Sequence, residues 1–165
     1  MTEGCEGGWP HFHSYFAENG HLVAEDCAPY QHSTSGSKCS QFQHCAGVAK
    51  VKKSYDVGGA YGLSSEKQMM KEVLRNGPLN TEFQAPSVFS TYKEGLVTAE
   101  GFQALHALAQ TKQSEKAHDI SDETLTGRGE PWEKLNHSVV LLGWGVDDTG
   151  EKFWHLRNSY GNKWG

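Results

Sequence analysis

A strand–turn–strand pattern near the carboxyl end constrains the fold of this chain more than any other feature. Residues 136–146 read as a strand that is apolar from Val139 onward, and Asp147-Asp148-Thr149-Gly150 follows as a turn before a second strand over 153–157. Opposite residues of such an antiparallel hairpin have a nearly constant index sum, here about 295–297. His137 and Asn158 have a sum within this interval, so the pattern predicts that their side chains lie within cross-strand reach.

An imidazole held by a side-chain amide is one half of a Cys-His-Asn catalytic arrangement. The amide oxygen orients the ring, while the other ring nitrogen faces a thiol, takes its proton and holds the thiolate as an ion pair. The alternative is a buried structural histidine bonded to an amide, which is the more common role of an isolated His/Asn pair. Catalysis is therefore indicated only if other segments of the chain support it.

Composition limits the size of the protein and its partners. The 165 residues are 36% hydrophobic and 21% charged, enough to build one domain or two halves that share a cleft. The net charge is -5 and no basic run is present, which argues against a nucleic-acid or anionic-membrane partner. No apolar run approaches the ~18 residues needed to cross a bilayer, so no membrane partner is expected.

The remaining chain shows the signals of short helices and strands. Ser65 can cap a helix that carries Met69, Met70, Val73 and Leu74 on one face, and Asn76-Gly77-Pro78 ends it. Further expected elements are a short helix over 8–19, strands over 48–55 and 79–83, a loop over 27–45 and a polar surface insertion over 103–129.

Three segments, in this order along the chain, resemble motifs of the papain-like cysteine peptidases. They are Gly4-Cys5-Glu6-Gly7-Gly8, the strand Asn136-His137-Ser138 through Gly145, and Arg157-Asn158-Ser159-Tyr160-Gly161-Asn162-Lys163-Trp164-Gly165. The segments Cys27-Ala28-Pro29-Tyr30, Val57 to Gly62 and Glu130-Pro131-Trp132-Glu133 are similar to the dipeptidyl peptidase branch of that family. The resemblance covers nearly the whole chain except about 101–129.

The resemblance implies an α+β, papain-like two-lobed fold, with an incomplete helical lobe and a β-barrel lobe. Residues 1–47 would be the remnant of the helical lobe and contain the disulfide loop. Residues 48–165 would form the β-barrel lobe, with the insertion at about 101–129 and the last strand of the barrel missing. The chain is accordingly expected to be the carboxyl-terminal part of a longer protein.

The resemblance also implies a role for individual residues. His137 matches the catalytic base and Asn158 the amide that orients it, while Gly7, Gly8, Trp9, Pro10 and Asn136 match substrate-binding positions. Trp164 matches the second Trp of the family's Asn-Ser-Trp-Gly-x-x-Trp-Gly segment. The first Trp of that segment is Tyr160 here, so the aromatic shield over the His/Asn bond is expected to be smaller.

The nucleophile is expected to be absent from these residues. The family's Cys-Gly-Ser-Cys segment and its upstream oxyanion-hole Gln occur nowhere in the sequence. Cys5 precedes His137 by an interval inside the ~130 to 150 residues typical of nucleophile and base. Cys5 nevertheless sits in a glycine turn instead of at a helix start that would lower its pKa, and the family uses this cysteine in a disulfide.

The resemblance pairs Cys27 with Cys45, which would close a loop that contributes about 3 kcal/mol by the chain-entropy argument. It leaves the partners of Cys5 and Cys39 outside the chain. A metal site built from His32, Cys39, His44 and Cys45 is disfavoured because adjacent His44 and Cys45 suit tetrahedral geometry poorly. No metal and no cofactor are expected. The dipeptidyl peptidase branch has a chloride site that includes tyrosines, and His11 and Asp56 stand at the matching positions here, so the resemblance does not extend to that site.

The favoured function is a cysteine-type peptidase that hydrolyses peptide bonds by Cys-His-Asn catalysis, acting on a peptide or protein substrate, as an endopeptidase or a dipeptidyl peptidase. The chain alone is expected to be inactive because the nucleophile is missing. The alternative is a non-catalytic homologue that acts as a peptide-binding or interaction module. A lysosomal or secreted location follows from the family resemblance, although the chain shows no targeting signal.

Overall fold

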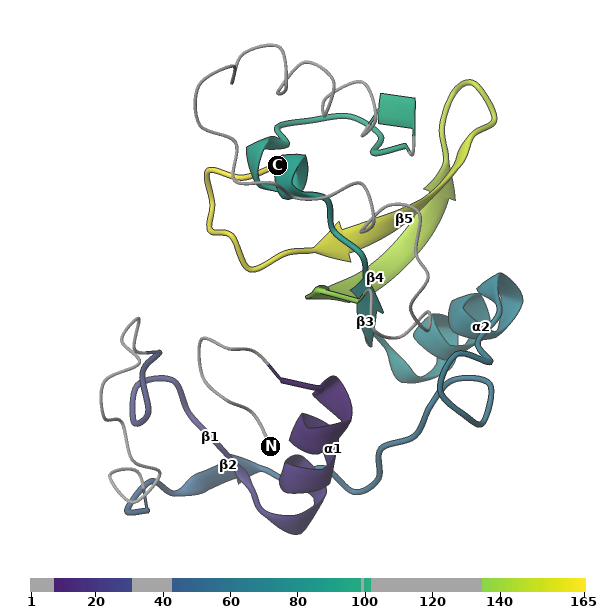
Figure 1. The fold of residues 1–165 in the computed structure, drawn as a ribbon. Helices are drawn as coiled ribbons and strands as arrows, with labels where there is room; N and C mark the ends of the chain where they lie inside the picture. The colour runs from purple at the N-terminus through teal and green to yellow at the C-terminus, as the bar shows by residue number, and fades with distance from the viewer. Residues whose placement is uncertain (1–7, 31–42, 99, 102–134) are drawn as a thin grey trace. The chain divides into compact units, whose positions relative to one another are not determined.

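The structure is a computed structural model that describes residues 8–30, 43–98, 100–101 and 135–165 (Figure 1). The chain divides into two compact units, Met1–Ser65 and Glu66–Gly165, and each is described by itself. The lobe boundary expected after residue 47 stays a prediction about the complete fold. The expected insertion at about 101–129 lies almost entirely outside the described residues.

The described residues of the first unit form one helix and a short two-stranded sheet. Helix α1 (Pro10–Asn19) begins with a proline at its first position, where the missing N–H costs nothing, and the Gly20 N–H donates to the Phe16 carbonyl at its end. This confirms the helix predicted over 8–19. Strand β1 (Leu22–Val23) pairs antiparallel with β2 (Gly47–Ala49).

The strand predicted over 48–55 is wrong beyond Ala49, where the chain has no regular structure. The carboxylate of Glu18 accepts hydrogen bonds from both the backbone N–H and the hydroxyl of Ser54. The Ser54 side-chain and backbone bonds lower the pKa of Glu18 because they stabilise its charged form. A carboxylate of the preceding helix therefore takes the backbone donor that a strand neighbour would otherwise use.

Two adjacent glycines in the turn before Ser65 provide a matched test of backbone geometry. Gly58 and Gly59 have similar left-handed φ values of 98° and 93°. A Cβ at Gly58 would lie 2.5 Å from the Leu63 carbonyl oxygen, whereas a Cβ at Gly59 would meet nothing within 4 Å. Only the first site therefore combines backbone strain with a steric clash.

We expect Gly58→Ala to destabilise the protein by about 2–4 kcal/mol, since the left-handed backbone and the clash both contribute. Gly59→Ala should lower the free energy of unfolding by only about 1–2 kcal/mol, the cost of placing a Cβ on a left-handed backbone. Urea unfolding of both variants measures the difference. Equal losses at the two positions would contradict the predicted clash with the Leu63 carbonyl.

The second unit is built on a three-stranded antiparallel sheet with the order β3-β4-β5 (Figure 1). Its strands are β3 (Leu79–Phe83), β4 (His137–Val146) and β5 (Lys152–Arg157), and a short 3-10 helix, η3 (Ser87–Thr91), follows β3. The sheet is not closed into a barrel within the described residues. Helix and strand content together confirm the expected α+β class.

Helix α2 (Glu66–Asn76) starts directly after Ser65 and ends at Gly77, whose φ of 97° is left-handed and whose N–H donates to the Val73 carbonyl. The predicted start and end are therefore confirmed. The predicted apolar face is wrong at one position, because Leu74 is 75% exposed while Met69, Met70 and Val73 are half-buried.

The hairpin formed by β4 and β5 follows the predicted arrangement with a small change in register. Val140 pairs with Arg157 and Leu141 with Leu156, and the register shifts between Leu141 and Gly143. Only one face of β4 is buried near its start: Val139 and Leu141 are 4% and 2% exposed. The opposite face is apolar as well, but Val140 and Leu142 lie on it and are more than a third exposed.

The turn between β4 and β5 is held by one carboxylate. Asp147 Oδ1 accepts hydrogen bonds from the Thr149 hydroxyl at 2.7 Å and from the Thr149 and Glu151 N–H groups at 2.9 Å each. The Thr149 hydroxyl, followed by the Glu151 N–H, lowers the pKa of Asp147 because these donors favour the carboxylate.

We expect the stabilisation from Asp147 to be present above the carboxyl's ordinary pKa and to be lost as the pH falls through the lowered value. Thr149→Val removes the strongest donor, so the pKa of Asp147 should move back upward. A carboxyl carbon NMR titration of both proteins measures this change. An unchanged Asp147 pKa in the variant would contradict the assigned cause.

Candidate active site

The side chains of His137 and Asn158 meet at one end of the β4–β5 hairpin. His137 is the first residue of β4, and Asn158 directly follows the last residue of β5. The distance between His137 Nε2 and Asn158 Oδ1 is 2.8 Å. Extension of the Val140–Arg157 register places the two residues diagonally, which confirms the proximity that the hairpin pattern predicted.

The hydrogen bonds of Asn158 assign the tautomer of the neutral imidazole. Asn158 Oδ1 accepts the Ser159 N–H at 2.8 Å as well as contacting His137 Nε2. A flipped amide would direct its NH2 group at the Ser159 N–H, so the oxygen must occupy this position. Because that oxygen can only accept, His137 Nε2 carries the proton and Nδ1 is left with the lone pair of the neutral ring.

The Asn158 amide is held at one end only. Its Nδ2 is buried and has no hydrogen-bond partner in the described part of the chain. Burying an unpaired amide donor is unfavourable by about 1–3 kcal/mol. The two bonds to Oδ1 therefore fix the amide orientation by themselves, and the His137 ring is part of what holds Asn158 in place.

Aromatic rings surround the half-buried imidazole. Their centroids lie 5.8 Å from that of His137 for Phe83, 5.9 Å for Phe89 and 4.9 Å for Tyr160. Tyr160 is tilted by 33° to the imidazole, so the position at which the family has Trp still carries a ring against the histidine. These contacts restrict the rotation of the imidazole.

Sequence reasoning missed the contributions of Phe83 and Phe89. Phe83 ends β3 directly opposite His137 in the strand pairing, so a correct pairing of β3 with β4 could have identified it. Phe89 lies in η3 and has no periodic or motif signal in the sequence. Its carbonyl accepts the Trp164 indole N–H at 2.8 Å, which joins η3 to the segment after β5.

Asn136 fixes the start of β4 through its amide. Its Oδ1 accepts the Ala85 N–H at 2.7 Å, and its Nδ2 donates to the Ala85 carbonyl at 3.0 Å. The Asn136 N–H donates in turn to the Phe83 carbonyl at 3.3 Å. The side chain thus extends the β3–β4 pairing by one step and positions the neighbouring His137.

The other expected substrate-binding residues belong to the first unit or lie outside the described residues. Gly8 is exposed, Trp9 precedes the first turn of α1, and Pro10 is the first residue of that helix. Gly7 lies outside the described residues, as do Cys5 and Cys39. The substrate-binding role of these positions stays a prediction.

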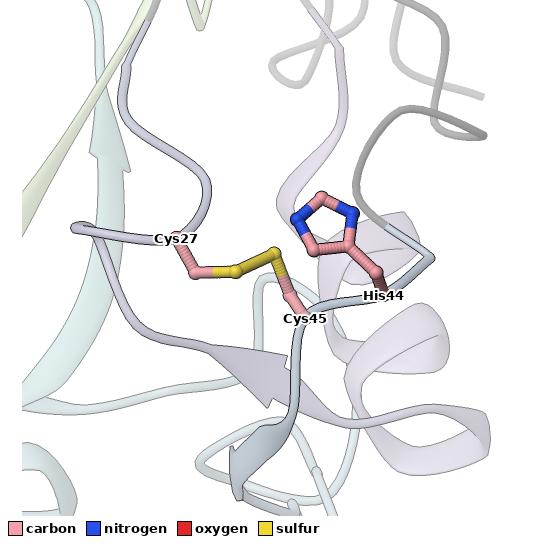
Figure 2. A group of neighbouring side chains, drawn as sticks. All are labelled: Cys27, His44 and Cys45. Atoms are coloured by element: carbon pink, nitrogen blue, oxygen red, sulfur yellow. A yellow bond between two sulfur atoms is a disulfide. The ribbon is translucent and has the colours of Figure 1, made fainter.

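Cys27 and Cys45 form a disulfide with a Cα–Cα distance of 5.9 Å, which is the pair that the family resemblance implies. His44 lies beside them, and the ligand atoms of the three residues are within 4.8 Å of one another (Figure 2). Zinc binds the thiolate form of cysteine, and neither sulfur offers a thiolate while the two are joined. This group therefore does not fit a metal in its disulfide form, and two members of the disfavoured metal set, His32 and Cys39, lie outside the described residues.

Comparison with known proteins defines the class. The model of the papain family of cysteine proteases matches residues 1–165. The structure of bromelain from Ananas comosus with the E64 inhibitor has a TM-score of 0.65 at 23% identity, covering 98% of this chain and 58% of that one, which shows a papain-like fold. The chain belongs to the papain family of cysteine proteases.

Two curated relatives are similar to most of the chain. Cathepsin C of Schistosoma mansoni is 32% identical over 166 residues, covering 99% of this chain and 32% of that protein. Dipeptidyl aminopeptidase 1 of Plasmodium falciparum (isolate 3D7) is 35% identical over 137 residues, covering 76% of this chain and 18% of that protein. The chain thus spans a third or less of the length of these relatives. Among the described residues, no helix is both long and apolar enough to cross a membrane.

Proposed function

We propose that this chain supplies the His–Asn half of a Cys-His-Asn site that hydrolyses peptide bonds. The observation that carries the proposal is the 2.8 Å contact between His137 Nε2 and Asn158 Oδ1, with Nδ1 left as the basic nitrogen. Membership of the papain family supports the same chemistry. The substrate is a peptide or a protein, and a lysosomal or secreted setting agrees with the Cys27–Cys45 disulfide.

In the proposed mechanism, His137 Nδ1 takes the proton of a cysteine thiol, and the thiolate attacks the carbonyl carbon of the peptide bond. The imidazolium then gives its proton to the leaving amine as the carbon–nitrogen bond breaks. Water, deprotonated by the same nitrogen, attacks the acyl-enzyme and releases the acid, and the thiol regains its proton. Asn158 keeps the ring oriented throughout, because its oxygen accepts the Nε2–H bond in both protonation states.

We propose that none of the four cysteines of the chain is the nucleophile. Cys27 and Cys45 are joined to each other. Cys5 is followed in the sequence by Glu6-Gly7-Gly8, and neither Cys5 nor Cys39 stands in the family's Cys-Gly-Ser-Cys segment. The chain alone should then hydrolyse dipeptidyl and longer peptide substrates no faster than background, and activity sensitive to thiol alkylation would contradict this part of the proposal.

The decisive experiment restores the missing half of the site. A chimera would extend the chain ahead of Met1 with the preceding part of the Schistosoma mansoni cathepsin C, expected to supply the family's Gln and Cys-Gly-Ser-Cys segment. The proposal predicts peptide hydrolysis that thiol alkylation stops. The control is the same chimera with the introduced nucleophile changed to alanine, which should be inactive.

A folded chimera that binds peptides without hydrolysing them would instead favour the non-catalytic homologue. Circular dichroism and urea unfolding establish that the chimera is folded before activity is compared. Hydrolysis that continues unchanged when His137 is replaced would exclude the proposed base.

A further inference from the structure

The second unit contains a pocket of about 420 Å³ that the mechanism above does not use. Two chain segments form it. Ser90 lies in η3 and Lys93 follows that helix, while Tyr160, Lys163 and Trp164 belong to the segment after β5. The Trp164 indole bond to the Phe89 carbonyl links these two segments, so the pocket has a fixed wall.

Two lysines give the pocket its charge. Lys93 Nζ donates to the Lys163 carbonyl at 3.2 Å, which holds one ammonium group at the pocket and leaves it two further N–H donors. Both lysine side chains are exposed. The ion pair found among the described residues joins Lys152 to Glu66, so it neutralises neither pocket lysine. The two ammonium groups are therefore available to an anionic group in the pocket.

The aromatic wall connects the pocket to the candidate base. The rings of Tyr160 and Trp164 lie 5.7 Å apart and are nearly perpendicular, at 87°. The same Tyr160 ring packs against the His137 imidazole, with 4.9 Å between the ring centroids. The Tyr160 ring would consequently lie between a group bound in the pocket and the imidazole of His137.

We propose that Lys93 and Lys163 determine specificity by binding a carboxylate of the peptide substrate in this pocket. The inference rests on the proposed function, because a peptide held at His137 brings its own side chains and termini to the neighbouring Tyr160 wall. Two sources supply the same chemistry: an acidic side chain and a free carboxyl terminus. The flanking rings of Tyr160 and Trp164 would contact the aliphatic carbons that carry the carboxylate.

The test compares three acetylated hexapeptides that differ only at the last residue. The first ends in glutamine amide, the second in glutamate amide, and the third in glutamine with a free carboxylate. Dissociation constants come from the NMR shift of the Trp164 indole N–H in the 165-residue chain, without turnover. We expect one or both charged peptides to bind about tenfold more tightly than the neutral one, a preference that weakens as salt is added.

Variants assign the preference to the two lysines. Lys93→Met and Lys163→Met should each reduce it about threefold, and the double variant should abolish it, whereas Lys93→Arg should retain it. Lys152→Met is the matched control, since it removes a lysine elsewhere in the same unit and should leave the preference unchanged. Equal affinity for all three peptides, or a preference that survives in the double variant, would overturn the proposal.

The two charged peptides also distinguish the source of the carboxylate. Tighter binding of the glutamate amide alone assigns the pocket to an acidic side chain, and tighter binding of the free acid alone assigns it to the carboxyl terminus. Because binding is measured without hydrolysis, failure of this test leaves the roles of His137 and Asn158 intact. Failure of the chimera to hydrolyse peptides would contradict those roles while leaving the measured charge preference unaffected.

Discussion

Replacing His137 with alanine in the active chimera is expected to lower kcat/KM for peptide hydrolysis by about a thousandfold or more. The imidazole both generates the thiolate and returns the proton to the leaving amine, so its loss affects every step of proton transfer. Thiol alkylation rates should fall as well at neutral pH, because the cysteine loses the ion-pair partner that lowers its pKa. Rates are measured on an equal concentration of folded protein.

Asn158 and a second histidine provide the controls for this result. Asn158→Ala should lower kcat while changing KM little, and Asn158→Asp should retain more activity because a carboxylate still accepts the Nε2–H bond. His155 is an exposed histidine on β5, so His155→Ala should leave kcat/KM close to that of the unmodified chimera. A similar loss from both histidine variants would indicate damage to the hairpin instead of removal of the base.

Replacing Phe89 with alanine is expected to destabilise the second unit by about 3–5 kcal/mol. Phe89 is only 4% exposed, and its ring contacts the rings of His137, Tyr92 and Trp164. Truncation leaves a cavity that these rigid rings fill poorly, since their positions are also set by backbone contacts. Urea unfolding followed by tryptophan fluorescence measures the loss.

An exposed phenylalanine provides the control for the loss of buried packing. Phe16 is 67% exposed, so Phe16→Ala should change the free energy of unfolding by less than about 0.5 kcal/mol. Phe89→Leu keeps most of the buried volume and should cost less than Phe89→Ala. A cost below about 1 kcal/mol for Phe89→Ala would show that the packing around His137 does not depend on η3.

Local sequence predicted the features that depend on neighbouring residues. The turn at Asp147 links two strands, and the short loop leaves so few possible registers that His137 and Asn158 must come together. Ser65 and Gly77 likewise mark the ends of α2, because capping is decided within one helical turn. In each case the interacting groups either lie within one helical turn or are joined by a single hairpin turn.

Features that join distant segments could not be predicted from local patterns. The segment after Ala49 alternates like a strand, yet the Glu18 carboxylate takes the Ser54 backbone donor. Leu74 fits a helical apolar face, yet it is exposed. Periodicity shows which residues can be buried together, but burial also needs another element to cover them.

The sequence by itself determined the pair of groups that carries the proposed chemistry, since one hairpin turn is enough to bring an imidazole and an amide into contact. Only the tertiary structure decided what surrounds that pair. Phe89 packs against the imidazole from η3, and Trp164 packs against Phe89 from the carboxyl-terminal segment, so the surroundings of the pair depend on the packing of η3 against that segment. The physical reason is that contacts between distant segments depend on the free energy of the whole packed unit, which no short stretch of sequence encodes.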